Sequence, residues 1–437
     1  MFETITTFFE AHSMAASIGI FLIAYFFIAT EKIEKSIAAI GGAVAVIALG
    51  LITFEDAVHA IDLNVIFLLI GMMTCVSILA ETGFFEWVAI YIAKLMKGDA
   101  VKILVSMLIV TMIFSALLDN VTTIILLAPV TILISQLLEI PTLPFLILEA
   151  IASNIGGTAT LIGDPPNIII GSMAELSFND FLINLSPGVA IIAVVFIISS
   201  VILMRKHLNV PDHIKERVNR AYPELAIRDS KNMKRSLIVF LIIFIGFFIH
   251  HSFDLEPGIV ALGGMCIMLV VCKSHTENML KAVEWDAILF FIGLFIMIGA
   301  LEENGVIEHL AKLMLNTCGD NMLFTAIIVL CGSAFFSAIL DNIPFVIAMT
   351  PLVQKLIVHS GGSPHGVHPL FWALALGACL GGNGTLIGAS ANVVASKIGA
   401  RNGYPITFMT FLKYGIPFTI QSVVIAVVYL WLRYFYF

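Results

Sequence analysis

The stretch Phe114-Ser-Ala-Leu-Leu-Asp119-Asn120 decides the fold, because a second copy, Phe336-Ser-Ala-Ile-Leu-Asp341-Asn342, follows 222 residues later. A proline stands at the same distance after each copy, at Pro129 and Pro351. Apolar segments flank both copies, so each copy places a carboxylate and an amide at membrane depth. A charged side chain there costs at least a few kcal/mol, and such residues usually belong to an ion or substrate pathway. Duplicated sites of this kind are typical of secondary transporters that are built from two repeats.

The composition is that of an integral membrane protein. Of the 437 residues, 60% are hydrophobic and 12% are charged, whereas soluble domains carry about 25% charged residues. Mean hydropathy is +1.05. The length suits about ten or eleven membrane spans of about 20 residues with short loops. We expect no nucleic-acid partner, because no basic stripe is present, and the six single cysteines without a CxxC motif are expected to pack as small core residues.

Basic residues indicate which loops lie in the cytoplasm. The first residues hold Glu3 and Glu10 but no positive segment, so we expect the first span, about 15–29, to remain as a membrane helix. The longest hydrophilic loop, 205–235, carries nine of the 22 basic residues. It is expected to be a cytoplasmic linker that fixes topology, with binding of nucleic acid or anionic lipid as the alternative. The whole chain is expected to be a multi-pass protein of a prokaryotic plasma membrane.

The duplication predicts an all-α protein of two repeats. We expect an N-terminal span in 1–35, the first repeat in 36–204, the linker in 205–235, and the second repeat with its own leading span in 236–437. Each repeat is expected to hold a hairpin, a broken helix and a closing span, at 102–138, 144–172 and 182–204 in the first and at 322–358, 369–400 and 407–434 in the second.

Each hairpin has its Asp-Asn pair between two apolar arms. The arms form either two full spans, with the pair in solvent, or a re-entrant hairpin that turns inside the membrane, with the pair buried in protein; we favour the second. Segment 84–97 is short and amphipathic, so we expect it along the cytoplasmic interface. With this placement the second repeat is inverted relative to the first, and the two tips approach from opposite sides. If segment 84–97 spans the membrane, that orientation changes.

The segment 144–172 is expected to break in the membrane. It is apolar but holds Gly156-Gly157 and Pro165-Pro166, and such residues interrupt a helix. Two half-helices joined by unwound backbone would expose N–H and C=O groups that attract ions. The same pattern returns around Gly381-Gly382 and Gly388.

Asp119 and Asp341 are the leading candidates for binding a coupling ion or proton, because hard cations prefer oxygen ligands. With Asn120 and Asn342 they form a candidate Na+ site. Each Asp is also suited to cap the N-terminus of its second hairpin arm, and the two roles are compatible.

Further transport-site contacts are expected from amide, hydroxyl and backbone groups of both repeats: Asn120, Asn154, Gly157, Thr158, Thr160, Asn167, Asn342, Asn383, Thr385, Ser390 and Asn392. Their alternative role is to satisfy the unwound backbone. Asp164 and Glu149 align with Ala389 and Leu374 of the other repeat, so they break the symmetry and are further candidates for proton coupling. No arginine lies in a core segment, which argues against a strongly anionic substrate.

Three of these segments, at 119–131, 154–170 and 377–394, resemble permeases of the ion transporter superfamily. The likeness covers nearly the whole chain and is to the branch of arsenite permeases and D-type sodium/proton antiporters, above all to P protein (pink-eyed dilution)-like permeases. It implies a homodimer in which a transport region moves against a scaffold as an elevator. It also implies that Asp119 and Asn120 with 156–167, and Asp341 and Asn342 with 381–392, line the sites.

The resemblance leaves the substrate open, since relatives move Na+ against H+, arsenite or antimonite, silicate, or dicarboxylates with Na+. Proton-coupled Na+ antiport is our first hypothesis, with Na+ or H+ as coupling ion and no other cofactor. Arsenite or antimonite efflux and Na+-coupled carboxylate transport are the alternatives. A channel or a non-transporting scaffold is less consistent with a pair of hairpins. An enzyme is not expected, because no nucleophile–base set, metal cluster or nucleotide loop is visible.

Overall fold

The computed structural model describes residues 12–436 except 31, 221, 275 and 319–320. The start of the expected N-terminal segment, with Glu3 and Glu10, lies outside the described residues. Within the described part all regular structure is helical, which confirms the all-α fold class.

In the described part of the first half and the linker, eleven α-helices are followed by three short linker helices. They are α2 (Ser13–Thr30), α3 (Lys35–Ala48), α4 (Phe54–His59), α5 (Leu63–Glu81), α6 (Phe84–Leu95), α7 (Ala100–Leu117), α8 (Asn120–Leu137), α9 (Thr142–Gly157), α10 (Pro165–Met173), α11 (Phe178–Asn184), α12 (Ser186–Met204), η1 (Arg205–His207), α13 (Asp212–Asn219) and η2 (Pro223–Ala226).

The second half continues in the same manner. Its helices are α14 (Ser230–Ile249), η3 (His250–Phe253), α15 (Pro257–Cys272), α16 (Thr276–Ala282), α17 (Trp285–Glu303), α18 (Val306–Cys318), α19 (Met322–Ile339), α20 (Asn342–His359), α21 (Pro369–Gly381), η4 (Gly382–Gly384), α22 (Ser390–Arg401), α23 (Phe408–Trp431) and η5 (Leu432–Tyr436).

The order of helices in the first half recurs in the second. The pairs α5 and α17, α7 and α19, and α8 and α20 begin and end 222 residues apart. The short helix before each hairpin also recurs, because α18 begins 222 residues after α6. The first helix of each half also corresponds, because α2 precedes α3 as α14 precedes α15. The N-terminal span, which we expected to stand outside the repeats, thus has a counterpart in the second half. The expected closing span at 182–204 is divided into α11 and α12, with Pro187 in the first turn of α12.

Nine helices in the described part are long and apolar enough to cross a membrane: α5, α7, α8, α12, α14 with η3, α17, α19, α20 and α23 with η5. Four apolar helices are shorter, namely α2, α3, α9 and α15. The 12 residues of α6 reach about 18 Å at about 1.5 Å per residue. That length is short of a hydrocarbon core of about 30 Å.

The helices form two groups that each take elements from both halves. In the first group, the scaffold bundle, α5 packs along α15 and α17 packs along α3, with α2 and α14 on the outside and α4 and α16 at the ends. In the second group, the hairpin bundle (α7–α12 and α19–α23), α9 packs against α7 and α8, and α21 packs against α19 and α20. Contacts between the two bundles are sparse and include α10 with α5 and α17 with α20.

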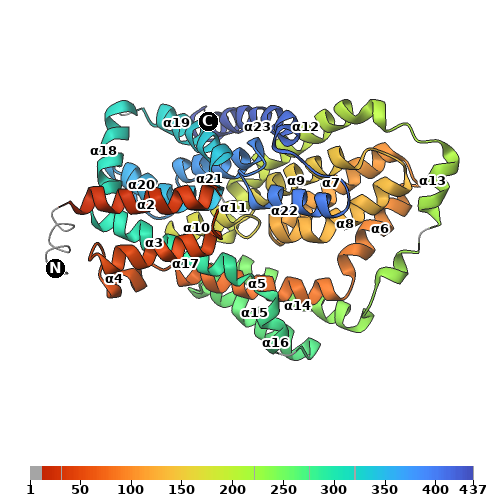
Figure 1. Cartoon of the computed structure of the whole chain (residues 1–437), viewed down its shortest axis with the longest axis horizontal. Coiled ribbons are helices and arrows are strands. Elements are labelled where there is room, and N and C mark those ends of the chain that lie inside the picture. Colours follow the sequence, from red (N-terminus) through yellow and green to blue (C-terminus); the bar gives the residue numbers. More distant parts are fainter. Residues whose placement is uncertain (1–11, 31, 221, 275, 319–320, 437) are drawn as a thin grey trace.

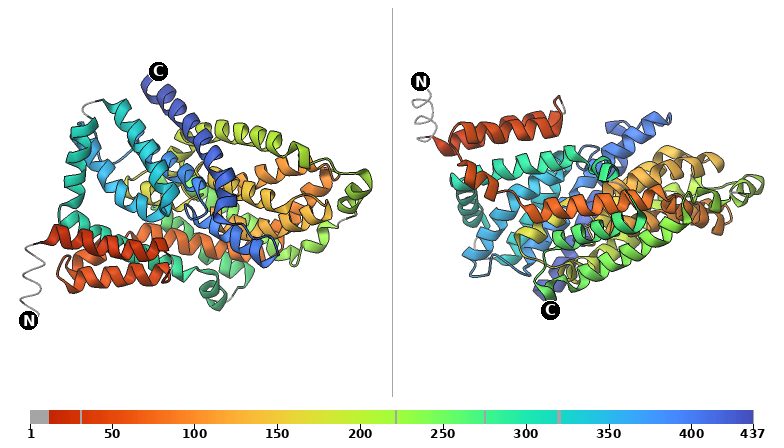
Figure 2. Two further views of the ribbon diagram at one scale, coloured as in Figure 1. Left: turned by 45° about the horizontal axis from the view of Figure 1, so that its top comes forward. Right: turned by 90° about the horizontal axis from the view of Figure 1, so that it is seen from below.

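The two hairpins lie toward opposite ends of the molecule. Figure 1 shows α19 and α20 at the end that holds α4 and α18, and α7 and α8 at the end that holds α6 and α13. The further views in Figure 2 keep the cyan hairpin and the orange hairpin apart in the same way. The tips of both hairpins therefore point toward the middle of the molecule.

The linker packs along α6. Its backbone N–H at Arg228 donates to the carbonyl of Thr82 at 2.9 Å, and the Arg228 guanidinium pairs with Glu86 at 3.0 Å. Gly83 has φ +82°, and a Cβ there would lie 1.8 Å from the carbonyl oxygen of Ala226. The turn between α5 and α6 is thus held by the linker.

Two equivalent glycines allow close helix crossings in the scaffold bundle. A Cβ at Gly71 of α5 would lie 2.6 Å from the carbonyl carbon of Ala261, and a Cβ at Gly293 of α17 would lie 2.5 Å from that of Ala39. Small residues at such points let membrane helices approach closely. The two halves interlock through this pair of crossings.

Alanine at Gly71 or Gly293 is expected to lower the free energy of unfolding by about 1–3 kcal/mol, because the added methyl group forces two backbones apart. Thermal unfolding of the purified protein in detergent measures this effect. Gly41→Ala and Gly263→Ala are matched controls, because an added Cβ meets nothing within 4 Å at either position. Equal losses in all four variants would contradict this role of the crossings.

Candidate functional site

Each hairpin tip is capped by its own aspartate. Asp119 Oδ1 accepts a hydrogen bond from the backbone N–H of Thr122 at 2.7 Å, at the start of α8. Asp341 Oδ1 accepts one from the N–H of Ile343 at 3.3 Å, at the start of α20. The capping role expected as the alternative is thus present for both residues, and it leaves further carboxylate lone pairs available.

The first arm of each hairpin is fastened to the broken helix of its own half by hydroxyl groups. Four hydroxyls donate to backbone carbonyls at 2.5–2.6 Å: Ser115 to Ser153, Thr160 to Ala116, Ser337 to Ala378, and Thr385 to Ala338. The same pair of contacts occurs in each half, so each hairpin and its broken helix form one unit.

One asparagine in each half satisfies the unwound backbone of the broken helix. The amide nitrogens of Asn167 and Asn392 donate to backbone carbonyls of the unwound segments: Gly157 (3.4 Å), Thr158 (3.1 Å) and Thr160 (2.8 Å) in the first half, and Gly382 (2.9 Å) and Thr385 (3.0 Å) in the second. The Thr158 hydroxyl donates to the carbonyl of Asn154. These residues therefore shape the breaks, as their alternative role predicted. The thiol of Cys379 donates to Asn167 Oδ1 at 3.5 Å, so this cysteine does more than fill the core.

Gly157 permits the sharp return of the chain at the first break. A Cβ at this position would lie 2.4 Å from the carbonyl oxygen of Gly163. The equivalent pair in the second half, Gly382 and Gly388, is nearly as close at 2.9 Å.

Asn154 joins the two broken helices. Its amide nitrogen donates to Asn383 Oδ1 at 2.8 Å and to Asn392 Oδ1 at 3.1 Å, both in the other half. Its own Oδ1 accepts from the amide of Asn120 at 3.0 Å. All four side chains are buried, so this amide network connects one hairpin tip to both breaks.

Asp164 is the point where the two hairpin tips meet. Its Oδ1 accepts from the amide of Asn120 at 3.0 Å and from the amide of Asn342 at 3.4 Å. Asp164 is fully buried at 0% exposure. The residue that breaks the internal symmetry therefore receives one amide from each half.

Several buried polar atoms around Asp164 have no hydrogen-bond partner among the described residues. They include Asp164 Oδ2, Asn120 Oδ1 and the amide nitrogen of Asn383. Native proteins satisfy the large majority of buried polar atoms, so such atoms point to a missing ligand or ion. Asp164 Oδ2 and Asn120 Oδ1 are acceptor oxygens, and they belong to two side chains that are hydrogen-bonded to each other.

A cavity of about 200 Å³ lies between the two bundles at this point. The hairpin bundle contributes Asp119, Asn120, Val121, Ile125, Asp164, Pro165, Asn342, Ile343, Ser390 and Val394, and the scaffold bundle contributes Leu69, Met73, Glu284, Ala287 and Phe291. Five predicted site residues thus line one cavity. The other predicted transport-site residues do not line this cavity; they are Asn154, Gly157, Thr158, Thr160, Asn167, Asp341, Asn383, Thr385 and Asn392.

Two further cavities extend from this one toward one end of the molecule. They share Ser390 with it, and Lys35 and Asp286 line both of them. The outer one also reaches Lys32 and Lys397. Toward the other end the two bundles are in contact instead.

The contact at that other end joins Asn64 of α5 to Ser172 of α10. The Asn64 amide donates to the Ser172 hydroxyl at 2.9 Å. In the internal alignment Asn64 corresponds to Asp286 and Ser172 to Lys397. Asn64 and Ser172 are thus in contact at one end of the site, whereas their counterparts Asp286 and Lys397 line the outer cavity at the other end.

Lys35 and Glu284 are site residues that the sequence analysis missed. Lys35 Nζ lies 2.7 Å from Asp341 Oδ2, so a scaffold helix and a hairpin tip share an ion pair. Lys35 stands where the other half has Pro257, and Glu284 stands where it has Asp62. The sequence shows these differences between the halves, but it does not show which residue Lys35 contacts.

Glu149 lies apart from the cavity. It is 2% exposed, on α9, and its Oε1 is 2.9 Å from the Thr131 hydroxyl and 3.3 Å from the Thr111 hydroxyl. The structure therefore separates Glu149 from the other predicted carboxylates.

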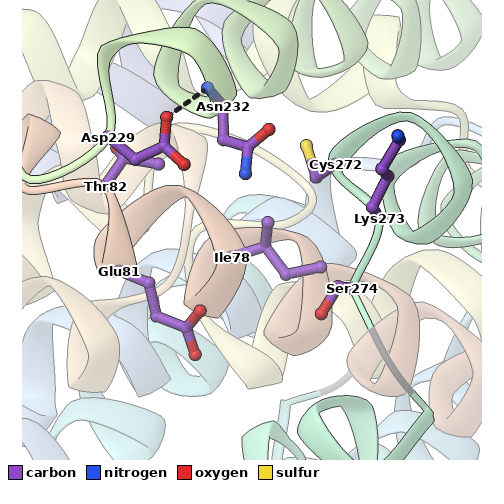
Figure 3. A pocket seen from close by; sticks show the side chains of 8 residues that line it. All are labelled: Ile78, Glu81, Thr82, Asp229, Asn232, Cys272, Lys273 and Ser274. Carbon is purple, nitrogen blue, oxygen red and sulfur yellow. Dashed lines mark hydrogen bonds between the residues drawn. The ribbon is translucent and has the colours of Figure 1, made fainter.

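A polar pocket of about 260 Å³ lies elsewhere, where α5 and α15 end and α14 begins. Figure 3 shows Glu81, Asp229, Asn232 and Lys273 around it, with a hydrogen bond from the backbone N–H of Asn232 to Asp229. That bond caps α14. The pocket shares no residue with the central cavity.

The chain resembles known membrane transporters in sequence and in fold. The sequence profile of the CitMHS family, described as citrate transporter, matches residues 25–377. An uncharacterized transporter of Mycobacterium tuberculosis is 44% identical over 423 residues, which cover 96% of this chain and 98% of the relative. The P protein of Mus musculus is 32% identical over 499 residues, covering 95% of this chain and 60% of that protein. The fold is similar to that of the YdaH transporter of Alcanivorax borkumensis, with a TM-score of 0.52 and 15% identity over 87% of this chain and 88% of that one.

Asn167→Ala is expected to destabilise the protein by about 1–3 kcal/mol, because buried carbonyl oxygens lose their donor. Thermal unfolding in detergent again provides the measurement. Asn402→Ala is the control, since the Asn402 amide also bonds a helix carbonyl but is exposed. Comparable losses in both variants would argue against a special role of Asn167 at the break.

Proposed function

Because this chain belongs to the CitMHS citrate transporter family of the ion transporter superfamily, we propose that it is a secondary active transporter that exchanges protons for a small cation, with Na+ as the first candidate. P proteins are among its relatives, as the sequence motifs had indicated. Relatives named as transporters support transport rather than catalysis as its role. We place it in a prokaryotic plasma membrane with the basic linker in the cytoplasm, working as a homodimer.

The observation that carries the proposal is the set of unpartnered oxygens in the central site. Asp164 Oδ2 and Asn120 Oδ1 are buried and receive no hydrogen bond from any described residue, and Asp119 and Glu284 line the same cavity. Oxygen atoms of this kind are the ligands that hard cations prefer. A multiply charged anion would meet three carboxyl groups here, and Lys35, which lines both adjoining cavities, already pairs with Asp341.

Arsenite or antimonite is the second candidate substrate. The neutral trihydroxide carries O–H donors, and these suit the same unpartnered acceptors. A carboxylate such as citrate is favoured by the description of the family and by Lys32 and Lys397, which line the outer cavity. The deeper cavity is lined by the carboxyl groups of Asp119, Asp164 and Glu284 and, among the described residues, by no lysine or arginine, so it does not suit a substrate that is itself a carboxylate.

Alternating access follows from the two bundles. The hairpin bundle would move against the scaffold bundle as an elevator, exchanging the open and the closed end of the site. The Asn64–Ser172 contact would open, and its counterparts Asp286 and Lys397 would meet as an ion pair. The Lys35–Asp341 pair, which joins the two bundles, would break in the same movement.

The transport prediction concerns inverted membrane vesicles that hold a pH gradient. Addition of Na+ is expected to dissipate the gradient, and Asp164→Asn to reduce this response at least tenfold, because the central oxygen ligand loses its charge. Glu55→Gln, on the exposed first turn of α4, is the control. Vesicles that respond to arsenite or citrate but not to Na+ would overturn the cation assignment.

The movement is tested by cross-linking. Paired cysteines at Asn64 and Ser172 are expected to cross-link and to stop transport, because they lock the closed end. Paired cysteines at Asp286 and Lys397 are expected to cross-link only under transport conditions. The four single-cysteine variants serve as controls, and failure of the second pair to cross-link during turnover would count against the exchange of ends.

A further inference from the structure

The buried Glu149 lies in a polar site that the central cavity does not use. Three helices each contribute one side chain: Thr111 from α7, Thr131 from α8 and Glu149 from α9. All three are at most 3% exposed, and Glu149 Oε2 has no partner among the described residues. Burial of a carboxylate without a compensating charge is costly.

The charged residues of the surrounding helices do not provide that compensation. Glu149 makes no hydrogen bond or ion pair within the described structure to any titratable side chain on the helices that pack against α9. Those side chains are Lys102 on α7, Asp119 at the start of α8, Cys379 on α21, Lys397 and Arg401 on α22, and Lys413, Tyr414 and Tyr429 on α23.

The count of hydroxyl hydrogens around Glu149 favours a proton on its carboxyl group. The Thr111 hydroxyl has one hydrogen, and it lies 2.8 Å from the Met107 carbonyl oxygen, which can only accept. The same hydroxyl also lies within donor distance of Glu149 Oε1, at 3.3 Å. If its single hydrogen goes to the nearer Met107 oxygen, Thr111 Oγ1 and Glu149 Oε1 face each other as acceptors unless Glu149 supplies a hydrogen. Thr131 remains a donor to the same oxygen at 2.9 Å.

The second half shows that the fold does not require this acid. Ser333 and Val353 stand at the positions of Thr111 and Thr131, and Leu374 at that of Glu149. Leu374 is fully buried, and the Ser333 hydroxyl has no partner in the described structure. In the second half, α19, α20 and α21 thus pack with an apolar residue at the position of Glu149. Glu149 therefore has a role other than packing.

We propose that Glu149 is a proton-binding site separate from the central cavity, so that the proton and the substrate cation are carried at different positions of the hairpin bundle. The inference rests on the proposed proton–cation exchange. Glu149 and Asn154 lie on the same helix, α9, whose end forms the first break. Gain or loss of the proton would therefore act on the helix that holds the amide network.

The experiment compares wild-type protein, Glu149→Gln and the control Glu55→Gln in proteoliposomes. Counterflow of labelled Na+ against unlabelled Na+ tests cation binding alone, and Na+ uptake driven by a pH gradient tests coupling. Glu149→Gln is expected to keep counterflow within twofold and to lose at least tenfold of gradient-driven uptake. Its melting temperature is expected to match that of the wild type, because glutamine replaces a group that is already neutral.

The outcomes separate this inference from the proposed function. If the wild type shows no Na+ counterflow, the proposed cation exchange fails. If the wild type shows both activities and Glu149→Gln keeps gradient-driven uptake, the separate proton site is refuted. If Glu149→Gln unfolds at a markedly lower temperature while Glu55→Gln does not, Glu149 is an ionised structural residue, and the proposal is likewise overturned.

Discussion

The central site depends on one buried carboxyl group that two hairpins share. Asp164 accepts hydrogen bonds from Asn120 and Asn342, and these residues begin the second arms of hairpins that lie toward opposite ends of the molecule. A buried carboxyl group is tolerated only where hydrogen bonds or an opposite charge compensate for lost hydration. Here that compensation comes from both halves at once, so any change in the charge of Asp164 acts on both hairpins.

The packing of the two halves is symmetric, whereas their chemistry is not. The glycine crossings at Gly71 and Gly293 recur at equivalent positions, as do the hydroxyl contacts between each hairpin and its broken helix. Asp164 and Glu149, in contrast, have apolar counterparts in the second half. Repeated packing suits two states of similar energy, and in the proposed mechanism the two acids without a counterpart would give those states different affinities for ions.

The sequence predicted the fold class and the family correctly, because hydropathy and a duplicated motif are local properties of the chain. It also predicted the hairpin tips and Asp164 as site residues, and the structure brings them together at one cavity. The role of Lys35 could not be predicted, since its partner Asp341 is 306 residues away and the contact depends on how the bundles pack. The same holds for the bonds from Asn154 to Asn383 and Asn392, which cross between the halves.

The cost of moving buried charge explains how such a bundle would couple two ions. If Asp164 is ionised and its cavity is empty, the hairpin bundle carries a charge that nothing in the site neutralises. The penalty for such a charge in a low-dielectric interior is several kcal/mol, and a difference of about 1.4 kcal/mol changes a population tenfold. The bundle would therefore cross mainly with a cation in the cavity. The proton proposed at Glu149 would act on this step through α9 and the amide network at its end, because its gain or loss would change how well the central site holds the cation.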